Sequence, residues 1–211
     1  MFHTLHGSAT KVIGCVLLAL TAPAVHSAES KPLRWHLVGV ISGPSSPFTT
    51  DAYFPTPLAA GALVDVILTI DTAASGSGSS SYVDYPAAIT SARIAGSDWS
   101  IKMRLPLNPG AITVANDDPD YGDMLDLDVT SSAVVPGATW YNFEVDLRDP
   151  GGPNPGIGPW APFTTTALPK RPPALGFFPS NVFYFQARRD LPGQPANGGA
   201  YYGQILSLTL M

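Results

Sequence analysis

The stretch Trp140–Arg148 constrains the fold of this chain more than any other part of the sequence. In it, apolar Tyr141, Phe143, Val145 and Leu147 alternate with polar or charged residues. Successive side chains of a strand point to opposite faces, so this period of two predicts a strand with one buried face. A lone strand cannot bury that face, and the rest of the chain must therefore supply a sheet around it and a second layer against it.

Other alternating runs supply the remaining strands, and 22 prolines and 20 glycines separate them without leaving room for a convincing helix. Further strands are expected at residues 34–41, 61–70, 88–95, 99–105, 111–115, 125–130, 181–188 and 201–210. This pattern predicts an all-β domain, an antiparallel two-sheet β-sandwich, with the jelly roll as a candidate topology.

The core is expected to combine the apolar face of Trp140–Arg148 with inward side chains of the other strands, while Glu144 points to solvent. Its further members are predicted to be Trp99, Ile101, Leu206 and Leu208. Residues 72–81 read as a mobile Gly/Ser/Ala loop. The long connection at residues 149–180 is either functional or held on the surface by its own apolar residues.

The first 28 residues read as a secretory signal peptide, which leaves 29–211 as a single domain. Lys11 precedes the apolar run Val12–Leu20, which is too short to span a bilayer, and small residues follow it up to Ala28. The segment Val12–Cys15 also resembles the cleavage motif of a lipoprotein, in which Cys15 would carry a lipid. This alternative fits less well, because the motif precedes the apolar core of the signal instead of following it. We therefore expect export to the periplasm or beyond, with no membrane span in the mature chain.

Composition excludes several kinds of site. Cys15, the one cysteine of the chain, would leave with the signal, and His36 would be the one histidine remaining of four, so disulfides and sites with two histidines are not expected. The formal net charge of −5 and the absence of a basic stripe argue against nucleic-acid binding.

The acidic stretch at residues 116–123 is a candidate metal site. Asp118, Asp120 and Asp123 lie around a glycine and faintly resemble a calcium loop, although the terminal bidentate glutamate is missing. Asp126 and Asp128 follow on one strand face, where a cation would relieve their repulsion. The competing interpretation is a solvated acidic turn beside a charged sheet face that prevents edge-to-edge aggregation.

Aromatic residues suggest a second candidate site, a platform for stacking on sugar rings. We select Trp160 and Phe163 in the long connection, together with Tyr82 and Tyr85. The competing interpretation is that these rings hold the connection against the domain.

No catalytic residues are predicted. His36 lies within a strand, and the sequence has no Gly-x-Ser-x-Gly elbow that would present a serine nucleophile. A pair of carboxylates such as Glu144 and Asp146 could hydrolyse a polysaccharide, but Glu144 is more simply a solvent-facing strand position.

Several segments in order resemble the β-sandwich ectodomains of bacterial exosortase-sorted proteins, the PEP-CTERM class. They are Val38–Gly43, Gly61–Asp71, Ile112–Asp117, Phe143–Pro150, Ala167–Leu175 and Tyr202–Leu208. The resemblance implies an exported bacterial domain associated with the cell surface or exopolysaccharide, and it supplies no catalytic residues. Members of the class continue into a Pro-Glu-Pro motif, an apolar helix and a basic end, which do not follow in this sequence.

Together these observations favour an exported, non-catalytic domain at the cell surface or in a matrix, which binds exopolysaccharide or associates with itself. The alternative function is a secreted polysaccharide hydrolase that uses carboxylates.

Overall fold

The computed structural model describes residues 31–45, 54, 58–103, 105, 109–132, 140–149, 163–189 and 197–211. The signal-peptide prediction lies outside these residues. Within these residues the regular structure consists of ten strands and one short 3-10 helix, η2. They are β1 Leu33–Pro44, β2 Leu63–Ile70, β3 Ser77–Gly78, β4 Tyr82–Ala95, β5 Ser100–Met103, β6 Gly110–Asp118, β7 Gly122–Ser132, β8 Trp140–Asp149, η2 Leu175–Phe177, β9 Ser180–Arg189 and β10 Asn197–Leu210. Within the described ranges, no helix has the length and apolar character needed to cross a membrane.

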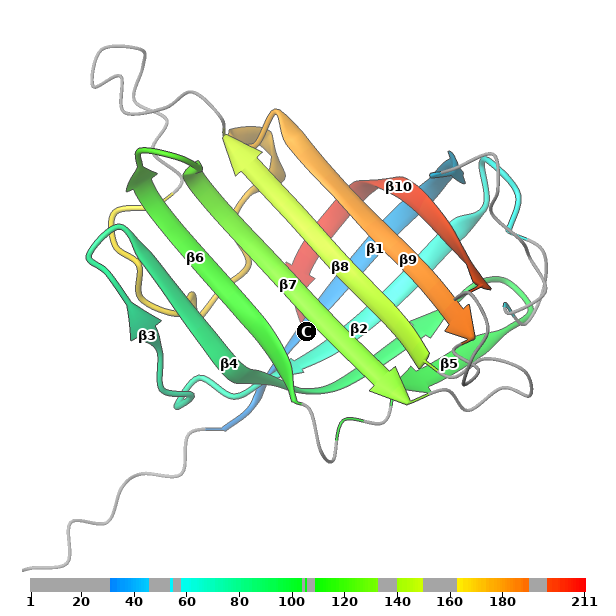
Figure 1. The fold of residues 1–211 in the computed structure, drawn as a ribbon, viewed down its shortest axis with the longest axis horizontal. Helices are drawn as coiled ribbons and strands as arrows, with labels where there is room; N and C mark the ends of the chain where they lie inside the picture. The colour runs from blue at the N-terminus through cyan, green and yellow to red at the C-terminus, as the bar shows by residue number, and fades with distance from the viewer. Residues whose placement is uncertain are drawn as a thin grey trace, which may run out of the picture.

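The strands form a closed barrel, so the prediction of a two-sheet sandwich is wrong. Eight antiparallel strands follow one another in the order β2-β1-β10-β9-β8-β7-β6-β4, and β4 pairs again with β2 to close the ring. Figure 1 shows β6, β7, β8 and β9 as a front wall, with β1 and β2 behind them. The short strands β3 and β5 add to β4 outside this ring.

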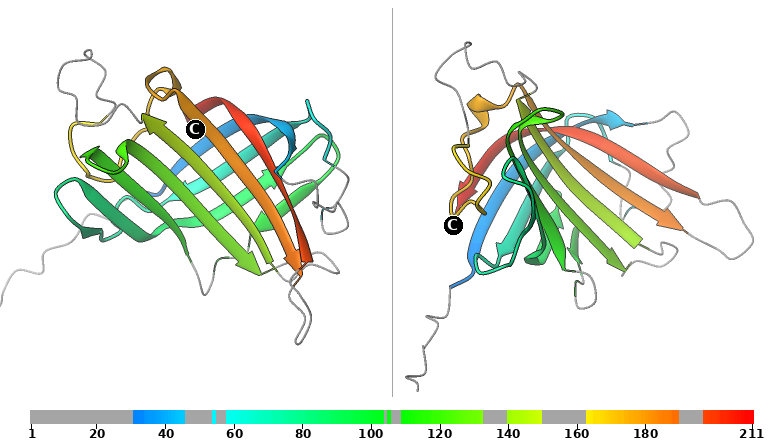
Figure 2. Two further views of the ribbon diagram at one scale, coloured as in Figure 1. Left: turned by 45° about the horizontal axis from the view of Figure 1, so that its top comes forward. Right: turned by 60° about the vertical axis from the view of Figure 1, so that its left-hand side comes forward.

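Two long, bent strands join the walls and explain why the barrel closes. The first half of β4 pairs with β6, and its second half, from Ile89 onward, pairs with β2. In the same way β10 pairs with β9 near its start and with β1 toward its end. The register shift of β4 falls between Tyr85 and Ile89, around Pro86, because proline cannot donate a ladder hydrogen bond. Both views in Figure 2 show β10 curving from one wall to the other.

Two glycines permit this bend of β10 against β1. An added Cβ at Gly39 would lie 2.4 Å from the Phe183 ring, and one at Gly203 would lie 2.3 Å from the same ring. The ring of Phe183 therefore occupies the space that side chains on β1 and β10 would otherwise fill. Glycines at such corners let a sheet coil tightly enough to form a barrel.

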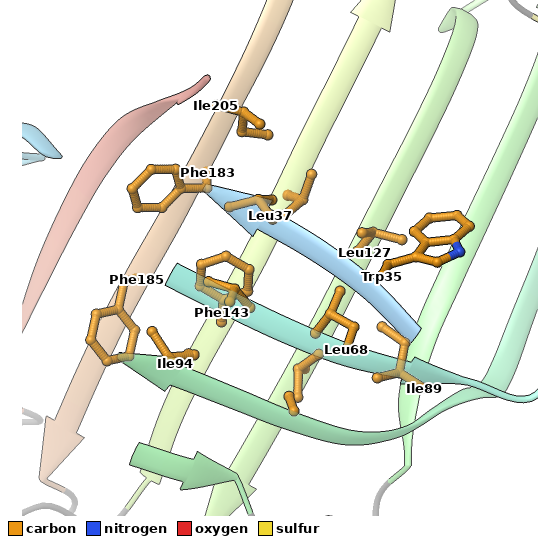
Figure 3. Close-up of a cluster of buried hydrophobic side chains, with 14 of the residues drawn as sticks. Trp35, Leu37, Leu68, Ile89, Ile94, Leu127, Phe143, Phe183, Phe185 and Ile205 are labelled. Atoms are coloured by element: carbon orange, nitrogen blue, oxygen red, sulfur yellow. The ribbon is translucent and has the colours of Figure 1, made fainter. Parts of the chain in front are cut away.

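The barrel interior is a packed core of side chains from all eight strands (Figure 3). The apolar face of β8 is confirmed, because Tyr141, Phe143, Val145 and Leu147 are all fully buried while Glu144 faces outward. Full burial of each such side chain contributes roughly 1.5–3 kcal/mol.

The predicted inward position of Leu206 is wrong, whereas that of Leu208 is right. Gly39 pairs with Ile205 and Val38 pairs with Ser207, so Leu206 is an extra residue in a β-bulge. The bulge reverses the alternation, and Leu206 is consequently 54% exposed.

The described part of the long connection, residues 163–179, packs against the barrel near the β6–β7 turn (Figure 1). Phe163 and Phe178 are buried and belong to the hydrophobic core, with their ring centroids 5.8 Å apart. This confirms that apolar residues hold this segment in place. The Gly/Ser/Ala loop is likewise partly structured, since β3 pairs with Val83 and Asp84 of β4.

Candidate functional site

The outward side chains of β7, β8 and β9 form one surface on the front wall, which we call the polar face. They point outward because they alternate with the buried core residues of the same strands. The polar face consists of Asp126, Asp128, Thr130, Asn142, Glu144, Asp146, Arg148, Tyr184, Gln186 and Arg188.

Four carboxylates lie in two adjacent rows at the centre of the polar face. Asp126 is directly opposite Asp146, and Asp128 is directly opposite Glu144. Side chains that are opposed in this way have Cβ atoms about 4.5–5.5 Å apart, and like charges there repel one another. The sequence placed Asp126 and Asp128 on one face but did not reveal their partners across β8.

This crowding changes the protonation of the carboxylates. Burial, followed by the charges of Glu144, Asp146 and Asp128, raises the pKa of Asp126 to about 7. Burial is also the main cause that raises the pKa of Asp128 and that of Glu144. At neutral pH Asp126 is consequently only partly ionised, so the cluster carries less negative charge than four full carboxylates would.

Two neighbouring side chains stabilise part of this cluster, one by an ion pair and one by a hydrogen bond. Arg148 donates from Nε to Asp146 Oδ1 over 2.6 Å, and Asn142 donates from Nδ2 to Asp128 Oδ1 over 2.9 Å. Among the residues described, the buried Oδ1 of Asp126 has no hydrogen-bond partner. Asp126 therefore has a buried carboxylate oxygen that no hydrogen bond among the described residues compensates.

Aromatic rings border the carboxylates. Tyr184 lies opposite Glu144 on one side and opposite Tyr202 of β10 on the other, and Tyr202 is 40% exposed. At the far end of β8, the Arg188 guanidinium lies 5.8 Å from the Trp140 ring centroid. The front wall therefore combines hydrogen-bonding groups with ring faces.

The aromatic residues predicted as a ligand platform do not come together. Phe163 is buried and Tyr85 donates its hydroxyl to the carbonyl of Thr166 over 2.9 Å, so both hold the long connection against the barrel. Trp160 lies outside the described residues. Tyr82 does face outward, where its ring centroid is 5.7 Å from that of Tyr121.

Tyr184 and its cross-strand neighbour Tyr202, which extends the polar face onto β10, were not among the predicted site residues. Both occupy outward positions of runs that were predicted to be strands, at residues 181–188 and 201–210. Strand alternation is therefore the signal that identifies them as outward-facing residues.

In the acidic loop, the predicted metal ligands hold the β6–β7 turn. Asp118 accepts hydrogen bonds from the Asp120 N–H over 3.0 Å and from the Ser81 hydroxyl over 2.9 Å, and these bonds, the former most strongly, lower its pKa. Asp123 accepts from the Asp117 N–H over 2.8 Å, while burial raises its pKa.

Asp120, the third predicted ligand, is exposed. The described residues contain no group of three or more His, Cys, Asp or Glu side chains arranged to hold a metal. Calcium binding stays a prediction, and a calcium titration of the melting temperature tests it, because a ligand of the folded state raises that temperature.

Comparison of this chain with models of protein families, with curated proteins and with solved structures gave no significant match.

Proposed function

We propose that this protein is an exported, non-catalytic domain that binds polysaccharide through the polar face. The observation that supports the proposal is the row of Asp128, Glu144, Tyr184 and Tyr202 across four adjacent strands, β7 to β10. Carboxylates accept hydrogen bonds from sugar hydroxyls, and tyrosine rings cover the apolar faces of sugar rings. An extended polymer would lie along such a row.

The charge of the polar face selects among polysaccharides. Four carboxylates lie near its centre, and the nearest guanidinium, that of Arg148, is already bonded to Asp146. Polymers rich in uronic acids or sulfate would be repelled. The ligand we propose is therefore an uncharged polysaccharide.

Replacement of Tyr184 with alanine tests this function. Removing one central ring is expected to weaken binding to a neutral glucan about tenfold, which corresponds to about 1.4 kcal/mol. Affinity electrophoresis measures the effect as retardation of the protein in a gel that contains the glucan. A second gel that contains an anionic uronan serves as the comparison.

Leu63→Ala is the matched control, because Leu63 is 58% exposed on β2, on the opposite wall of the barrel. Wild-type protein that migrates equally in gels with and without glucan would contradict the proposal. A concentration-dependent increase in molar mass without glucan binding would instead favour self-association.

Hydrolysis is a second candidate function, and the opposed pair Asp126 and Asp146 favours it. Retaining glycosidases use two carboxyl groups about 5–5.5 Å apart, of which one must hold a proton near neutral pH. A pKa of about 7 gives Asp126 that property. Release of reducing ends by the wild type, lost in Asp126→Asn and in Asp146→Asn, would establish hydrolysis in place of simple binding.

A further inference from the structure

A groove of about 770 Å³ lies at the opposite wall of the barrel, between the turn that precedes β2 and the turn that joins β4 to β5. Most of its described lining is apolar: Val38, Leu58, Leu63, Val64, Ala95 and Trp99. Pockets of this volume and character hold small molecules in many proteins. None of these lining residues belongs to the polar face.

The aromatic wall of the groove is fixed by its packing. The Trp99 ring stacks on Phe185 with centroids 6.0 Å apart and an interplanar angle of 8°. On the β4–β5 turn, a Cβ added to Gly96 would lie 2.3 Å from Trp99 Nε1, so glycine lets the indole lie close to the backbone. Such a preformed wall binds a ligand without the cost of ordering it.

An exposed leucine forms another part of the groove. Leu63 is 58% exposed, although it is a large apolar side chain at the start of β2. A ligand in the groove would cover Leu63 and gain about 25 cal/mol for each Å² of apolar surface removed from water.

The charged groups of the groove restrict the ligand. Asp65 and Asp98 are the acidic residues of its lining, and no basic side chain is among the described lining residues. Next to the groove, His36 Nε2 lies 2.6 Å from Asp65 Oδ2, which leaves the exposed carboxylate of Asp98 as the acid without a basic partner among the described contacts. A ligand with a positive charge complements these acids, whereas an anion is repelled.

We propose that this groove binds a small aromatic molecule that carries a positively charged amine. The aromatic part lies between Trp99 and Leu63, and the amine faces Asp98. This inference does not depend on the polar face or on polysaccharide binding.

Two probes with the same ring system and opposite charge test the proposal: 1-naphthylmethylamine and 1-naphthoate. The full chain labelled with ¹⁵N is titrated with each probe, and the indole N–H signals of Trp99 and Trp35 are followed. We expect the amine to shift the Trp99 signal while that of Trp35, which is fully buried in the barrel, stays in place. Binding of the naphthoate is expected to be at least tenfold weaker.

Two variants locate the binding. Leu63→Ser is expected to weaken binding of the amine at least fivefold, and Asp98→Asn to reduce its advantage over the naphthoate. Leu206→Ser is the control, because Leu206 is 54% exposed but does not line the groove. Equal affinity for the two probes, an unmoved Trp99 signal, or equal losses in Leu63→Ser and Leu206→Ser would overturn the proposal.

Discussion

Replacement of Phe183 with alanine is expected to lower the free energy of unfolding by about 3–5 kcal/mol, the usual cost of deleting a buried phenylalanine ring. The ring is fully buried, lies 5.7 Å from that of Phe143, and fills the space above Gly39 and Gly203. Its loss opens a cavity where β1 and β10 bend between the walls. Chemical denaturation followed by tryptophan fluorescence measures the change.

The glycines make this test specific to the corner of the barrel. Gly203→Val alone is expected to destabilise the protein by about 1–3 kcal/mol, because the new side chain would overlap the Phe183 ring. In the Phe183→Ala background the same substitution should cost less, since the overlap with the ring is gone and only that with the Val40 carbonyl oxygen, 2.4 Å from the added Cβ, remains. Leu206→Ala, at an exposed position of β10, is the control and should change stability by less than about 0.5 kcal/mol. Strictly additive effects of Gly203→Val and Phe183→Ala would contradict this packing.

Replacement of Asp126 with asparagine is expected to stabilise the protein at pH 8 and to have little effect at pH 4. The pKa of Asp126 is about 7 in the folded state, against 3.8 for an unburied aspartate. Well below pH 3.8 the group is protonated in both states. Between pH 4 and 7 the unfolded chain loses the proton first, so the stability of the fold decreases as the pH rises.

The size of this effect follows from the pKa difference. Each unit corresponds to about 1.4 kcal/mol, so the contribution of Asp126 is on the order of a few kcal/mol across this pH range. Unfolding of the wild type and of Asp126→Asn at pH 4, 6 and 8 measures it. Asp120→Asn is the control, because Asp120 is exposed in the β6–β7 turn. A variant whose stability runs parallel to that of the wild type from pH 4 to 8 would show that Asp126 is ionised throughout.

Short-range pattern was sufficient to predict most of the strands and most of their inward faces, but it missed β3 and the first half of β4, residues 82–87. In β8, every second residue from Tyr141 to Leu147 is apolar, and these residues are buried as expected. The pattern failed at Leu206, because a β-bulge reverses the alternation and the sequence contains no local signal for it.

Closure of the barrel could not be predicted in this way, because it depends on pairing between distant segments. A sandwich and a barrel have the same alternating strands, and they differ in whether long strands such as β4 and β10 continue from one wall to the other. Gly39 and Gly203 allow β1 and β10 to make that bend, but a glycine in a strand predicts a bend, a bulge or a close contact equally well.

The polar face was predicted only in part, because it too depends on which strands pair with one another. Alternation placed Asp126 and Asp128 on one side of β7, and the opposed Glu144 and Asp146 emerged only with the register of β8. Burial, followed by the charges of Glu144 and Asp146 on β8, raises the pKa of Asp126, and the sequence of β7 alone reveals neither cause.

Pairing between β2 and β4 is the central claim, because it closes the barrel and places the polar face and the groove on opposite walls. Hydrogen-bond scalar couplings across these strands, measured by NMR on the full chain, test it most directly. The structure predicts contacts between Val66 and Ile94 and between Leu68 and Ala92, with slow amide exchange on both strands. Fast exchange along β2 on the side facing β4, with no coupling between the two strands, would contradict the barrel.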